Sequence, residues 1–397
     1  MSQPPSARRF LLPLVPLYRL ALTLRDLRLG AGLEPVRRLR FPVVSVGSLS
    51  AGGSGKTPLT IALAQALTSR GLRVDVLSRG YGRHSQLPAR VNPNGAAEDF
   101  GDEPLLIARE AGVPVYVAAQ RYQAGLLAET DADKSNSDSI SRNINPGKKT
   151  SESRGALLAA ETTATTEFYE GSVSGHDFSR AESSLKDSRA LAPERVFSGN
   201  LHLLDDGFQH RQLHRDVDIL LFDRHDMQGR LLPAGNLREP LEAMRRATVL
   251  AIPADDPELE TKLKASGWQG PIWRLHRRMD VPHIEGPVVA FCGIARSEQF
   301  FAGLQVAGLH LASRIAFPDH HHYKVHDLDC ILDAARSTGA TAFVTTEKDR
   351  VRLGELAAAL SEPLPLRTAR LRIEIDDEHA AIDWLADRLA NLPTRSS

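Results

Sequence analysis

The 397-residue sequence has few of the features that mark disulfide-bonded or nucleic-acid-binding proteins. It contains two cysteines, Cys292 and Cys330, and neither belongs to a CxxC pair. This is too few for a disulfide framework, and it indicates a reducing, cytoplasmic compartment. Basic and acidic residues balance at 49 each, which gives a formal net charge of zero. Proteins that bind nucleic acids usually carry a basic excess, so we expect no nucleic-acid partner.

The amino-terminal region also lacks an apolar run long enough to cross a bilayer. The uninterrupted apolar run that starts at Phe10 ends at Arg19, about half of the ~20 residues that a membrane span needs. No small-residue cleavage site of the signal-peptide type accompanies it. A spanning helix is therefore not expected here.

What residues 1–40 do contain is a local basic excess of eight arginines over two acids. From Tyr18 onward, Leu20, Leu24 and Leu27 recur near helical spacing with arginines between them. We predict that residues 1–40 form an amphipathic segment that lies on an anionic membrane surface. The alternative is a first helix that packs against the core and keeps a solvated basic face.

Short apolar strands alternate with helical segments through most of the chain. Strands are expected at 41–46 and 74–77, and a helix at 58–67 lies between them. This alternation predicts an α/β fold of the P-loop NTPase type, with a mostly parallel sheet and helices on both faces.

The pattern also suggests how the chain is divided. A core is expected over residues 41–285 and a smaller C-terminal α/β lobe over residues 286–397. Residues from about 130 to 195 interrupt the core with Ser, Thr, Asn, Asp and Gly and no sustained periodicity. Such a stretch buries too little apolar surface to offset its ordering entropy, so we predict a disordered insertion.

One loop, "SVGSLSAGGSGKTPLT" at residues 45–60, has the pattern of a phosphate-binding site. It ends in Gly-Lys-Thr, although a serine stands where the usual first glycine would be. Its backbone N–H groups can turn toward an anion, and the following helix adds the positive end of its dipole. A lysine at this place reaches the β- and γ-phosphates, and the threonine hydroxyl ligates Mg²⁺. The predicted nucleotide-binding residues are Ser50, Ala51, Gly52, Gly53, Ser54, Gly55, Lys56 and Thr57.

Two adjacent acids, Asp205 and Asp206, follow the apolar strand "LHLL". A P-loop enzyme needs a carboxylate on the Mg²⁺ side of the nucleotide, at the end of a neighbouring strand. Adjacent carboxylates repel one another unless a cation lies close to them. The pair therefore predicts a Mg²⁺ site beside the phosphate loop.

The residues alone leave the phosphoryl acceptor open. A GTPase should read guanine with an NKxD-type segment, but "TEKD" at 346–349 has Glu where Asn is needed. Partitioning ATPases carry an additional lysine at the position of Ala51. A kinase, a P-loop NTPase of the metallochaperone or partner-driving type, and a nucleotide-binding scaffold without catalysis remain as alternatives.

Eight segments, the phosphate loop among them, make the chain resemble the tetraacyldisaccharide 4′-kinase family, the inner-membrane-associated kinases of lipid A synthesis. In chain order they are "VGSLSAGGSGKTP" (46–58), "SRGYGR" (78–83), "GDEP" (101–104), "LDDGFQHR" (204–211), "GNLREPL" (235–241), "FCGIARSEQF" (291–300), "FPDHHHY" (317–323) and "TTEKD" (345–349). Many NTPases share GKT, whereas DDGFQH together with FPDHHHY is specific. Residues 130–195 lie outside the resemblance, and Ser48 stands where the family often has Asn.

The resemblance implies transfer of the γ-phosphoryl group of ATP to the 4′-hydroxyl of a lipid disaccharide 1-phosphate, which gives the 1,4′-bisphosphate. Lys56 would serve ATP, and Thr57 would serve ATP and Mg²⁺. Asp102 matches the catalytic base and His320 its partner, while the acids Asp205, Asp206 and Glu239 match the metal network. The reference pKa of an aspartate is about 3.9. Asp102 would thus be ionised, and it could orient the hydroxyl and take its proton late.

The resemblance also implies a membrane-embedded substrate, the lipid disaccharide monophosphate. We therefore expect a cytoplasmic protein that associates peripherally with the cytoplasmic face of the inner membrane. Arginines can hold phosphate groups by forked hydrogen bonds. The predicted substrate-binding residues are Arg79, Tyr81, Arg83, Arg121, Gln209, His210 and Arg238.

Overall fold

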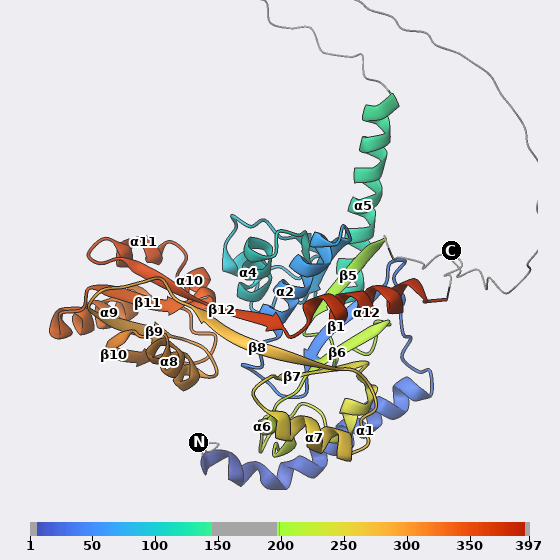
Figure 1. Ribbon diagram of the computed structural model, residues 1–397, viewed down its shortest axis with the longest axis horizontal. Helices are drawn as coiled ribbons and strands as arrows, with labels where there is room; N and C mark the ends of the chain where they lie inside the picture. Colours follow the sequence, from blue (N-terminus) through green and yellow to red (C-terminus); the bar gives the residue numbers. More distant parts are fainter. Residues whose placement is uncertain (1–5, 145–196, 198, 394–397) are drawn as a thin grey trace, which may run out of the picture. The chain divides into compact units, whose positions relative to one another are not determined.

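The computed structural model describes residues 6–144, 197 and 199–393. The described residues form a 12-stranded sheet in the order β10-β9-β11-β12-β8-β7-β6-β1-β5-β2-β4-β3 (Figure 1). Its strands are β1 (Val43–Ser48), β2 (Arg73–Ser78), β3 (Ala89–Arg90), β4 (Val115–Val117), β5 (Asn200–Asp205), β6 (Val217–Leu221), β7 (Val249–Pro253), β8 (Ile272–Asp280), β9 (Pro287–Cys292), β10 (His310–Ala316), β11 (Ala342–Thr346) and β12 (Leu366–Ile375). Neighbouring strands pair in parallel, except for β8 with β12 and β3 with β4. The predicted mostly parallel α/β sheet is confirmed.

Helices connect the parallel strands. They are η1 (Ser6–Leu14), α1 (Val15–Gly30), α2 (Lys56–Ser69), α3 (Ala97–Phe100), α4 (Asp102–Glu110), α5 (Arg121–Ile144), α6 (Arg224–Met227), η2 (Leu241–Arg246), α7 (Pro257–Ala265), α8 (Ser297–Val306), α9 (Val325–Thr338), α10 (Glu347–Leu353), α11 (Leu356–Ser361) and α12 (Glu378–Ala390). Helical crossovers between parallel strands cover both faces of a sheet.

Both faces of the sheet are buried, as the alternation along β9 illustrates. Val289 and Phe291 pack in one hydrophobic cluster with residues of α9 and α11. Val288, Ala290 and Cys292 pack in another cluster with residues of α8. Because successive side chains of a strand point to opposite faces, a strand that is apolar at every position needs a helix layer on each side.

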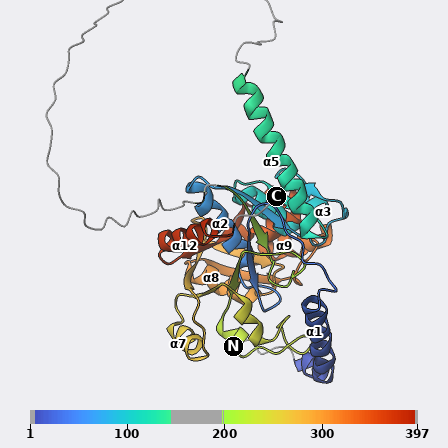
Figure 2. The same cartoon turned by 90° about the vertical axis from the view of Figure 1, so that its right-hand side faces the viewer.

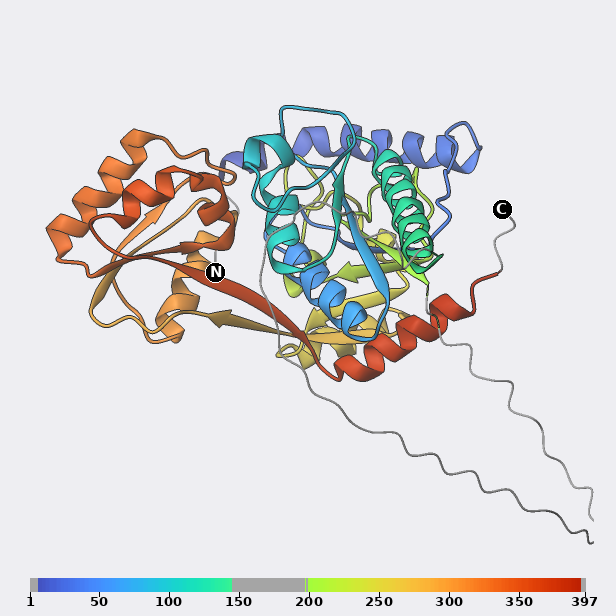
Figure 3. The same cartoon turned by 90° about the horizontal axis from the view of Figure 1, so that it is seen from above.

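An antiparallel junction joins the two parallel sets of strands. Strand β12 pairs with β11 over residues 366–369 and with β8 over residues 370–375. The last paired residue of β11, Thr346, lies opposite Ala369, and the last residue of β8 lies opposite Arg370. The carboxyl ends of the two sets therefore meet near the middle of β12, as the long β8 and β12 arrows in Figure 3 show. Loops at the carboxyl ends of parallel strands commonly form binding sites, and here two such edges face one another.

The predicted boundary at residue 286 stays a prediction. Residues 1–133 and 195–397 group into one compact unit. The final helix, α12, contributes Ile382, Leu385 and Leu389 to the same hydrophobic cluster as Leu59 and Leu63 of α2. The chain's last helix thus packs beside the phosphate-loop helix, and not with the strands β9–β11 that precede it.

The predicted insertion at 130–195 is wrong in its first part. Helix α5 continues without a break to Ile144. It begins with Ala124 and Ala128 packed in a buried cluster, and Tyr116 donates a hydrogen bond to Asp131. A helix anchored in this way propagates at low cost through polar residues that have no hydrophobic period. Residues 145–195 lie outside the described residues.

A buried histidine ties α5 to the sheet at the amino-terminal part of β5. The Nδ1 atom of His202 lies 2.7 Å from Asp75 of β2, and Nε2 lies 3.5 Å from Glu129 of α5. The longer contact is an ion pair without the geometry of a hydrogen bond. Burial alone would lower the pKa of His202, but Asp75 and Glu129 outweigh burial and raise the pKa to about 9.

We expect this charge cluster to make stability depend on pH. A histidine whose pKa is higher in the folded state stabilises fully below its unfolded pKa of about 6.5. Its contribution, about 3 kcal/mol for a shift of this size, is lost as the pH rises through about 9. Replacement of His202 by Gln should lower the melting temperature at pH 6 and flatten its decline toward pH 9.5.

Scanning calorimetry at both pH values would measure the effect. His283, which is 89% exposed, provides the control variant His283→Gln. Equal losses of melting temperature between pH 6 and 9.5 in wild type and His202→Gln would contradict this role of His202.

Candidate active site

The phosphate loop connects β1 to α2 as the sequence predicts. Gly52, Gly53 and Gly55 have φ angles of 78°, 63° and 92°, a left-handed region that glycine adopts without strain. The ammonium group of Lys56 donates to Ser48 Oγ at 3.1 Å and to Ser54 Oγ at 3.2 Å. The lysine is thus held over the loop, beside the N-terminus of α2, where an anion is favoured.

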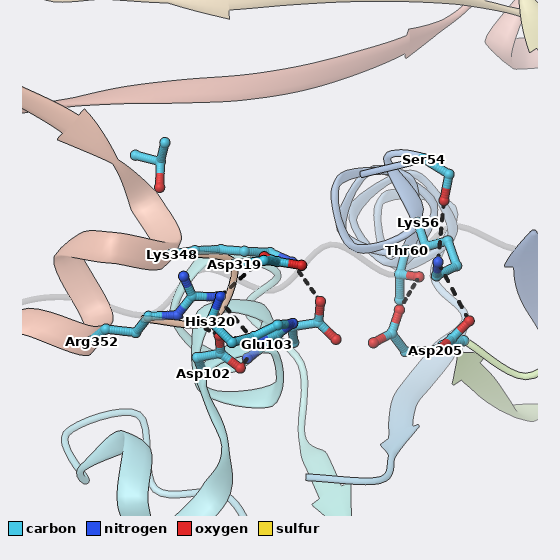
Figure 4. A network of polar contacts seen from close by, with 12 residues as sticks. Ser54, Lys56, Thr60, Asp102, Glu103, Asp205, Asp319, His320, Lys348 and Arg352 are labelled. Carbon is cyan, nitrogen blue, oxygen red and sulfur yellow. Dashed lines mark hydrogen bonds and ion pairs between the residues drawn. The ribbon is translucent and has the colours of Figure 1, made fainter. Parts of the chain in front are cut away.

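The two acids after β5 lie beside this lysine. Asp206 lies 3.5 Å from Lys56, and Asp205 accepts a hydrogen bond from Thr60 at 3.2 Å. Thr57 is buried and lies one turn before Thr60, so both hydroxyls share one face of α2. Figure 4 shows Lys56, Thr60 and Asp205 gathered at the start of α2.

The surroundings of the two acids shift their pKa values in opposite directions. Burial raises the pKa of Asp205 to about 7, and the negative charges of Glu103 and Asp206 add to the rise. Burial also opposes ionisation of Asp206, but Lys56 and Arg238 outweigh it and lower the pKa of that carboxyl. A cation bound nearby would therefore stabilise the ionised form of Asp205.

This donor set fits Mg²⁺. Among the described residues, no cluster of three or more His, Cys, Asp or Glu side chains is arranged to hold a metal ion. Mg²⁺ in nucleotide sites needs no such cluster, because it takes one or two protein oxygens and completes its shell with phosphate oxygens and water. The hydroxyl of Thr57 and the carboxyls of Asp205 and Asp206 lie beside the phosphate loop, and Asp206 is paired with Lys56 and Arg238.

Glu239, which the sequence placed in the metal network, has other contacts. Its carboxylate is buried, lies 3.1 Å from Arg25 of α1, and forms an ion pair with Arg246. Both oxygens are thus paired with arginines away from the Thr57 hydroxyl. A metal role of Glu239 stays a prediction that these contacts do not support.

Cationic side chains surround Asp206. Arg238 donates to its two carboxylate oxygens at 2.9 and 2.8 Å, and Arg121 donates to its main-chain oxygen at 3.4 Å. Burial lowers the pKa of Arg121, and the positive charge of Arg79 lowers it further. The Nε atom of Arg121 is buried without a hydrogen-bond partner. Two predicted substrate-binding arginines, Arg121 and Arg238, thus contact Asp206, and Arg79 lies close enough to Arg121 to affect its pKa; this concentration of positive charge favours an anionic ligand.

Two residues of the DDGFQH segment extend this cluster. Gln209 donates to the carbonyl of Ser48 at 2.9 Å and accepts from Arg238 at 3.3 Å. Burial and the charges of Arg121, Arg215 and Arg79 lower the pKa of His210 to about 4. His210 is therefore neutral at physiological pH and does not add to the positive charge.

The predicted substrate residues of the SRGYGR turn differ from one another. Arg83 is 5% exposed and donates to the carbonyl of Leu87, while its Nε and Nη2 atoms lack partners. Burial lowers the pKa of this arginine. Tyr81 is 66% exposed, and its ring lies 5.7 Å from that of His320. Tyr81 is thus open to a ligand, whereas Arg83 faces the interior of the turn.

The predicted pair Asp102 and His320 is brought together from opposite parts of the chain. Asp102 is the first residue of α4, and His320 lies in the loop between β10 and α9 with a φ of 58°. Asp102 Oδ2 lies 3.3 Å from His320 Nδ1. Arg352 of α10 donates from Nε and Nη2 to the same oxygen, at 2.7 and 2.5 Å. Figure 4 shows the side chains of His320 and Arg352 beside that of Asp102.

Sequence reasoning missed Arg352, although it lies three residues after the last residue of the TTEKD segment. Its guanidinium also bonds Asp349 at 3.1 Å and the carbonyl of Gly293 at 2.6 Å. A spacing of three residues on a helix places Arg352 and Asp349 on one face. That spacing was the available signal for its role.

Loops from the two facing sheet edges meet at the phosphate loop. A Cβ atom added at Gly52 would lie 3.1 Å from Ala295 and 4.0 Å from Asp319. A Cβ atom added at Gly53 would lie 2.7 Å from the Arg296 side chain. The loops after β9 and β10 therefore pack against the glycine turn, which puts the segment carrying His320 beside the predicted nucleotide site.

Comparisons with known proteins agree with this geometry. A model of the tetraacyldisaccharide-1-P 4′-kinase family matches residues 7–137 and 185–390. A protein of Koribacter versatilis named tetraacyldisaccharide 4′-kinase is 35% identical, over 94% of this chain and 96% of that protein. A protein of the same name from Parvibaculum lavamentivorans is 34% identical, over 93% and 86% of the two chains. A crystal structure of the "apo" form of LpxK from Aquifex aeolicus in complex with ATP superposes with a TM-score of 0.62; it is 27% identical and the match covers 96% and 99% of the chains.

Proposed function

The chain belongs to the tetraacyldisaccharide-1-P 4′-kinase family, and from this premise we propose that it phosphorylates the 4′-hydroxyl of a tetraacyldisaccharide 1-phosphate with ATP. The product is the 1,4′-bisphosphate, an intermediate of lipid A synthesis. One observation supports the proposal above the others. Ala295, Arg296 and Asp319, in the loops after β9 and β10, lie against the glycine turn of the phosphate loop, and His320 directly follows Asp319, which supports a site where the Asp102–His320 pair could act on a substrate beside a triphosphate.

The donor side of the reaction uses the phosphate loop. Lys56 would contact the β- and γ-phosphates, and the loop N–H groups would hold the remaining phosphate oxygens. Mg²⁺, held by Thr57 and Asp205, would neutralise charge on the β- and γ-phosphates. Phosphoryl transfer depends mostly on positioning and charge neutralisation. These residues would position the triphosphate of ATP and neutralise its charge.

The acceptor side uses the cationic cluster and the Asp102–His320 pair. Arg79, Arg121 and Arg238 would bind a phosphate of the acceptor or the nucleotide, because burial and the charge of Arg79 leave Arg121 with a lowered pKa that an anion would offset. The pair would orient the 4′-hydroxyl toward the γ-phosphate and take its proton.

The alternative function is a partner-driving NTPase. The kinase and the NTPase differ in whether the rate of ADP formation depends on the lipid acceptor. A kinase should form ADP slowly without lipid and at least about tenfold faster with the disaccharide monophosphate, with one ADP formed per phosphorylated lipid. Rapid ADP formation at the same rate with and without the lipid would favour the NTPase. Both quantities can be measured in one chromatographic assay.

Helix α1 supports a location at a membrane surface. None of its residues is fully buried, which favours a surface helix over a first helix packed in the core. It contacts the protein through polar groups, with Tyr18 donating to the carbonyl of Arg238 at 2.8 Å and Arg25 to Glu239 at 3.1 Å. Figure 2 shows α1 with the rest of the chain on one side only.

The side of α1 that faces away from these contacts is apolar. Leu17, Leu20, Leu24 and Leu27 are 65%, 53%, 51% and 63% exposed. Their spacing of three or four residues makes them one stripe. None of the helices in the described residues is long and apolar enough to span a membrane. A leucine stripe with arginines near it instead fits a helix lying in the headgroup region of an anionic bilayer.

We expect the double variant Leu17→Ser, Leu24→Ser to bind membranes weakly. Each leucine would contribute about 1.5 kcal/mol of burial, so the loss should be roughly 100-fold in partition. Sedimentation with vesicles of phosphatidylethanolamine and phosphatidylglycerol would measure it. Val306→Ser removes an even more exposed apolar side chain elsewhere, 90% exposed, and serves as the control. Unchanged partition of the double variant would remove α1 as the membrane-binding element.

A further inference from the structure

Residues 236–239, between α6 and η2, pair through their backbone with the start of the phosphate loop. The Ala51 N–H donates to the carbonyl of Asn236 at 2.8 Å. The Arg238 N–H donates to the carbonyl of Leu49 at 2.7 Å, and the residues between these two bonds form an antiparallel β-bridge. Because both bonds join the same two segments, a displacement of one segment would displace the other.

The side chain of Arg238 extends this pairing to the lysine of the loop. Its Nη1 atom donates to both carboxylate oxygens of Asp206, at 2.9 and 2.8 Å. Asp206 in turn lies 3.5 Å from Lys56. The φ of Asp206 is 48°, a left-handed conformation that persists only where surrounding contacts hold it. Arg238 therefore helps to set the position of the lysine ammonium, which the phosphates of a nucleotide would contact.

Helix α1 donates hydrogen bonds to the same segment. The Tyr18 hydroxyl donates to the carbonyl of Arg238 at 2.8 Å. Arg25 donates through Nη2 to the carboxylate of Glu239 at 3.1 Å. Tyr18 and Arg25 lie about two helical turns apart, so both donors are on one face of the helix. That face of α1 thus contacts two adjacent residues of the segment that pairs with the phosphate loop.

The ion pair of Arg25 with Glu239 differs from an ordinary surface pair, because the acid is buried. The Glu239 side chain is 3% exposed, and its second oxygen pairs with Arg246. Burial alone would lower the pKa of Arg25, but Glu239 and Asp26 outweigh burial and raise that pKa. Removal of one partner from a buried ion pair leaves the other charge poorly compensated. Without Arg25, Glu239 would therefore shift, and one peptide bond joins it to Arg238.

From these contacts we propose that Tyr18 and Arg25 are positioning residues for phosphoryl transfer. They hold residues 238 and 239, and Arg238 in turn sets Asp206 and the lysine of the phosphate loop. Helix α1 is in this way part of the framework of the active site, in addition to carrying the leucine stripe. The inference rests on the proposed function, because turnover of the lipid acceptor is its readout.

The kinetics of Tyr18→Phe and Arg25→Gln in mixed micelles test the proposal. Tyr18→Phe removes one hydroxyl, and we expect kcat at saturating ATP and lipid to fall about threefold. Arg25→Gln removes a charged donor and should lower kcat about tenfold. The KM for the lipid should stay within about twofold in both variants. Tyr18→Phe should also keep wild-type partition to vesicles, because the leucines of α1 are unchanged.

Rescue by a conservative variant separates positioning from a general loss of structure. Arg25→Lys keeps a positive charge beside Glu239, and its kcat should return to within about threefold of wild type. All rates are taken per mole of folded enzyme, with the folded fraction measured by near-ultraviolet circular dichroism. Wild-type kcat in both Tyr18→Phe and Arg25→Gln would overturn the proposal. A loss of rate that appears only below saturating lipid would also overturn it, since α1 would then serve the reaction through lipid binding alone.

Matched variants of α1 control for changes in the helix itself. Thr23→Val removes a hydroxyl that donates within the helix, to the carbonyl of Arg19, and should keep wild-type kcat. Arg19→Gln removes the same charge from an exposed position, so a larger loss of rate in Arg25→Gln isolates the contact with Glu239. A wild-type protein that does not phosphorylate the lipid refutes the proposed function, whereas an active wild type with unimpaired Tyr18→Phe and Arg25→Gln refutes only this inference.

Discussion

Replacement of Lys56 by Met is expected to lower kcat by about 10²–10³-fold, the usual effect of removing one preorganised charge from the transition state. Lys56 is held between Ser48 and Ser54 and lies 3.5 Å from Asp206, so its ammonium is fixed before the nucleotide arrives. Methionine preserves the length of the side chain and removes the charge. Single-turnover kinetics at saturating ATP and lipid would measure the chemical step without the contribution of binding.

Lys264 of α7 provides the matched control, because it is exposed and pairs only with Glu260 on its own helix. Lys264→Met should retain kcat within twofold, as expected for a surface ion pair. A Lys56→Met variant with wild-type kcat would mean that the loop does not hold the transferred phosphoryl group.

Replacement of Arg352 by Ala is expected to destabilise the protein by about 3–5 kcal/mol, the usual cost of removing one partner from a buried ion pair. Arg352 is 5% exposed, and it neutralises both Asp102 and the fully buried Asp349. Its removal leaves two buried carboxylates with a reduced positive charge nearby. It also removes one of the two side-chain links between α10 and α4 and leaves the ion pair of Lys348 with Glu103.

The same variant should change the acid side of the stability profile. The pKa of Asp102 is depressed in the folded state, so this carboxylate stabilises the fold above its unfolded pKa of about 3.9. That contribution is lost only as the pH falls below this value toward the folded pKa. Without Arg352 the folded pKa rises, and the contribution of Asp102 at neutral pH becomes smaller.

Urea unfolding between pH 3 and pH 7 would measure both effects. Arg336→Ala removes a 75% exposed arginine from a surface pair with Asp333 and should cost no more than about 1 kcal/mol. Equal free energies of unfolding for Arg352→Ala and wild type would show that the contacts of Arg352 are not important for the fold.

The local sequence was sufficient to predict the first half of the sheet and its phosphate loop. A short apolar strand, a glycine turn and Gly-Lys-Thr leave few alternatives, and β1 and α2 form where expected. Asp205 and Asp206 follow β5, which pairs with β1, so their place beside Lys56 follows from the parallel sheet. The family resemblance rested on the order of the motifs along the chain, which can be read without a structure.

The second half of the site depends on elements that the sequence did not reveal. Strands β8 and β12 read "IWRLHRRMD" and "LRTARLRIEI", with arginines where a buried strand would be apolar. Their partial exposure hides the alternation that identifies a strand. Because these two strands join the parallel sets, the meeting of Asp102 with His320 and Arg352 could not be derived from local pattern alone.

The leucines of α1 show a second limit of sequence reasoning. Helical spacing alone cannot tell whether an apolar stripe faces the core or another apolar phase. In the structure Tyr18 and Arg25 donate hydrogen bonds to the protein while Leu17 and Leu24 stay exposed, and this is an observation that helical spacing could not supply.

The most direct test of the whole account follows the phosphoryl group itself. Purified protein would be incubated with Mg²⁺, γ-labelled ATP and the tetraacyldisaccharide 1-phosphate in mixed micelles, and the lipid product would be examined by phosphorus NMR. The account predicts a second phosphomonoester, on the 4′-oxygen, that carries the label. Label recovered only as inorganic phosphate, with the lipid still singly phosphorylated, would contradict it.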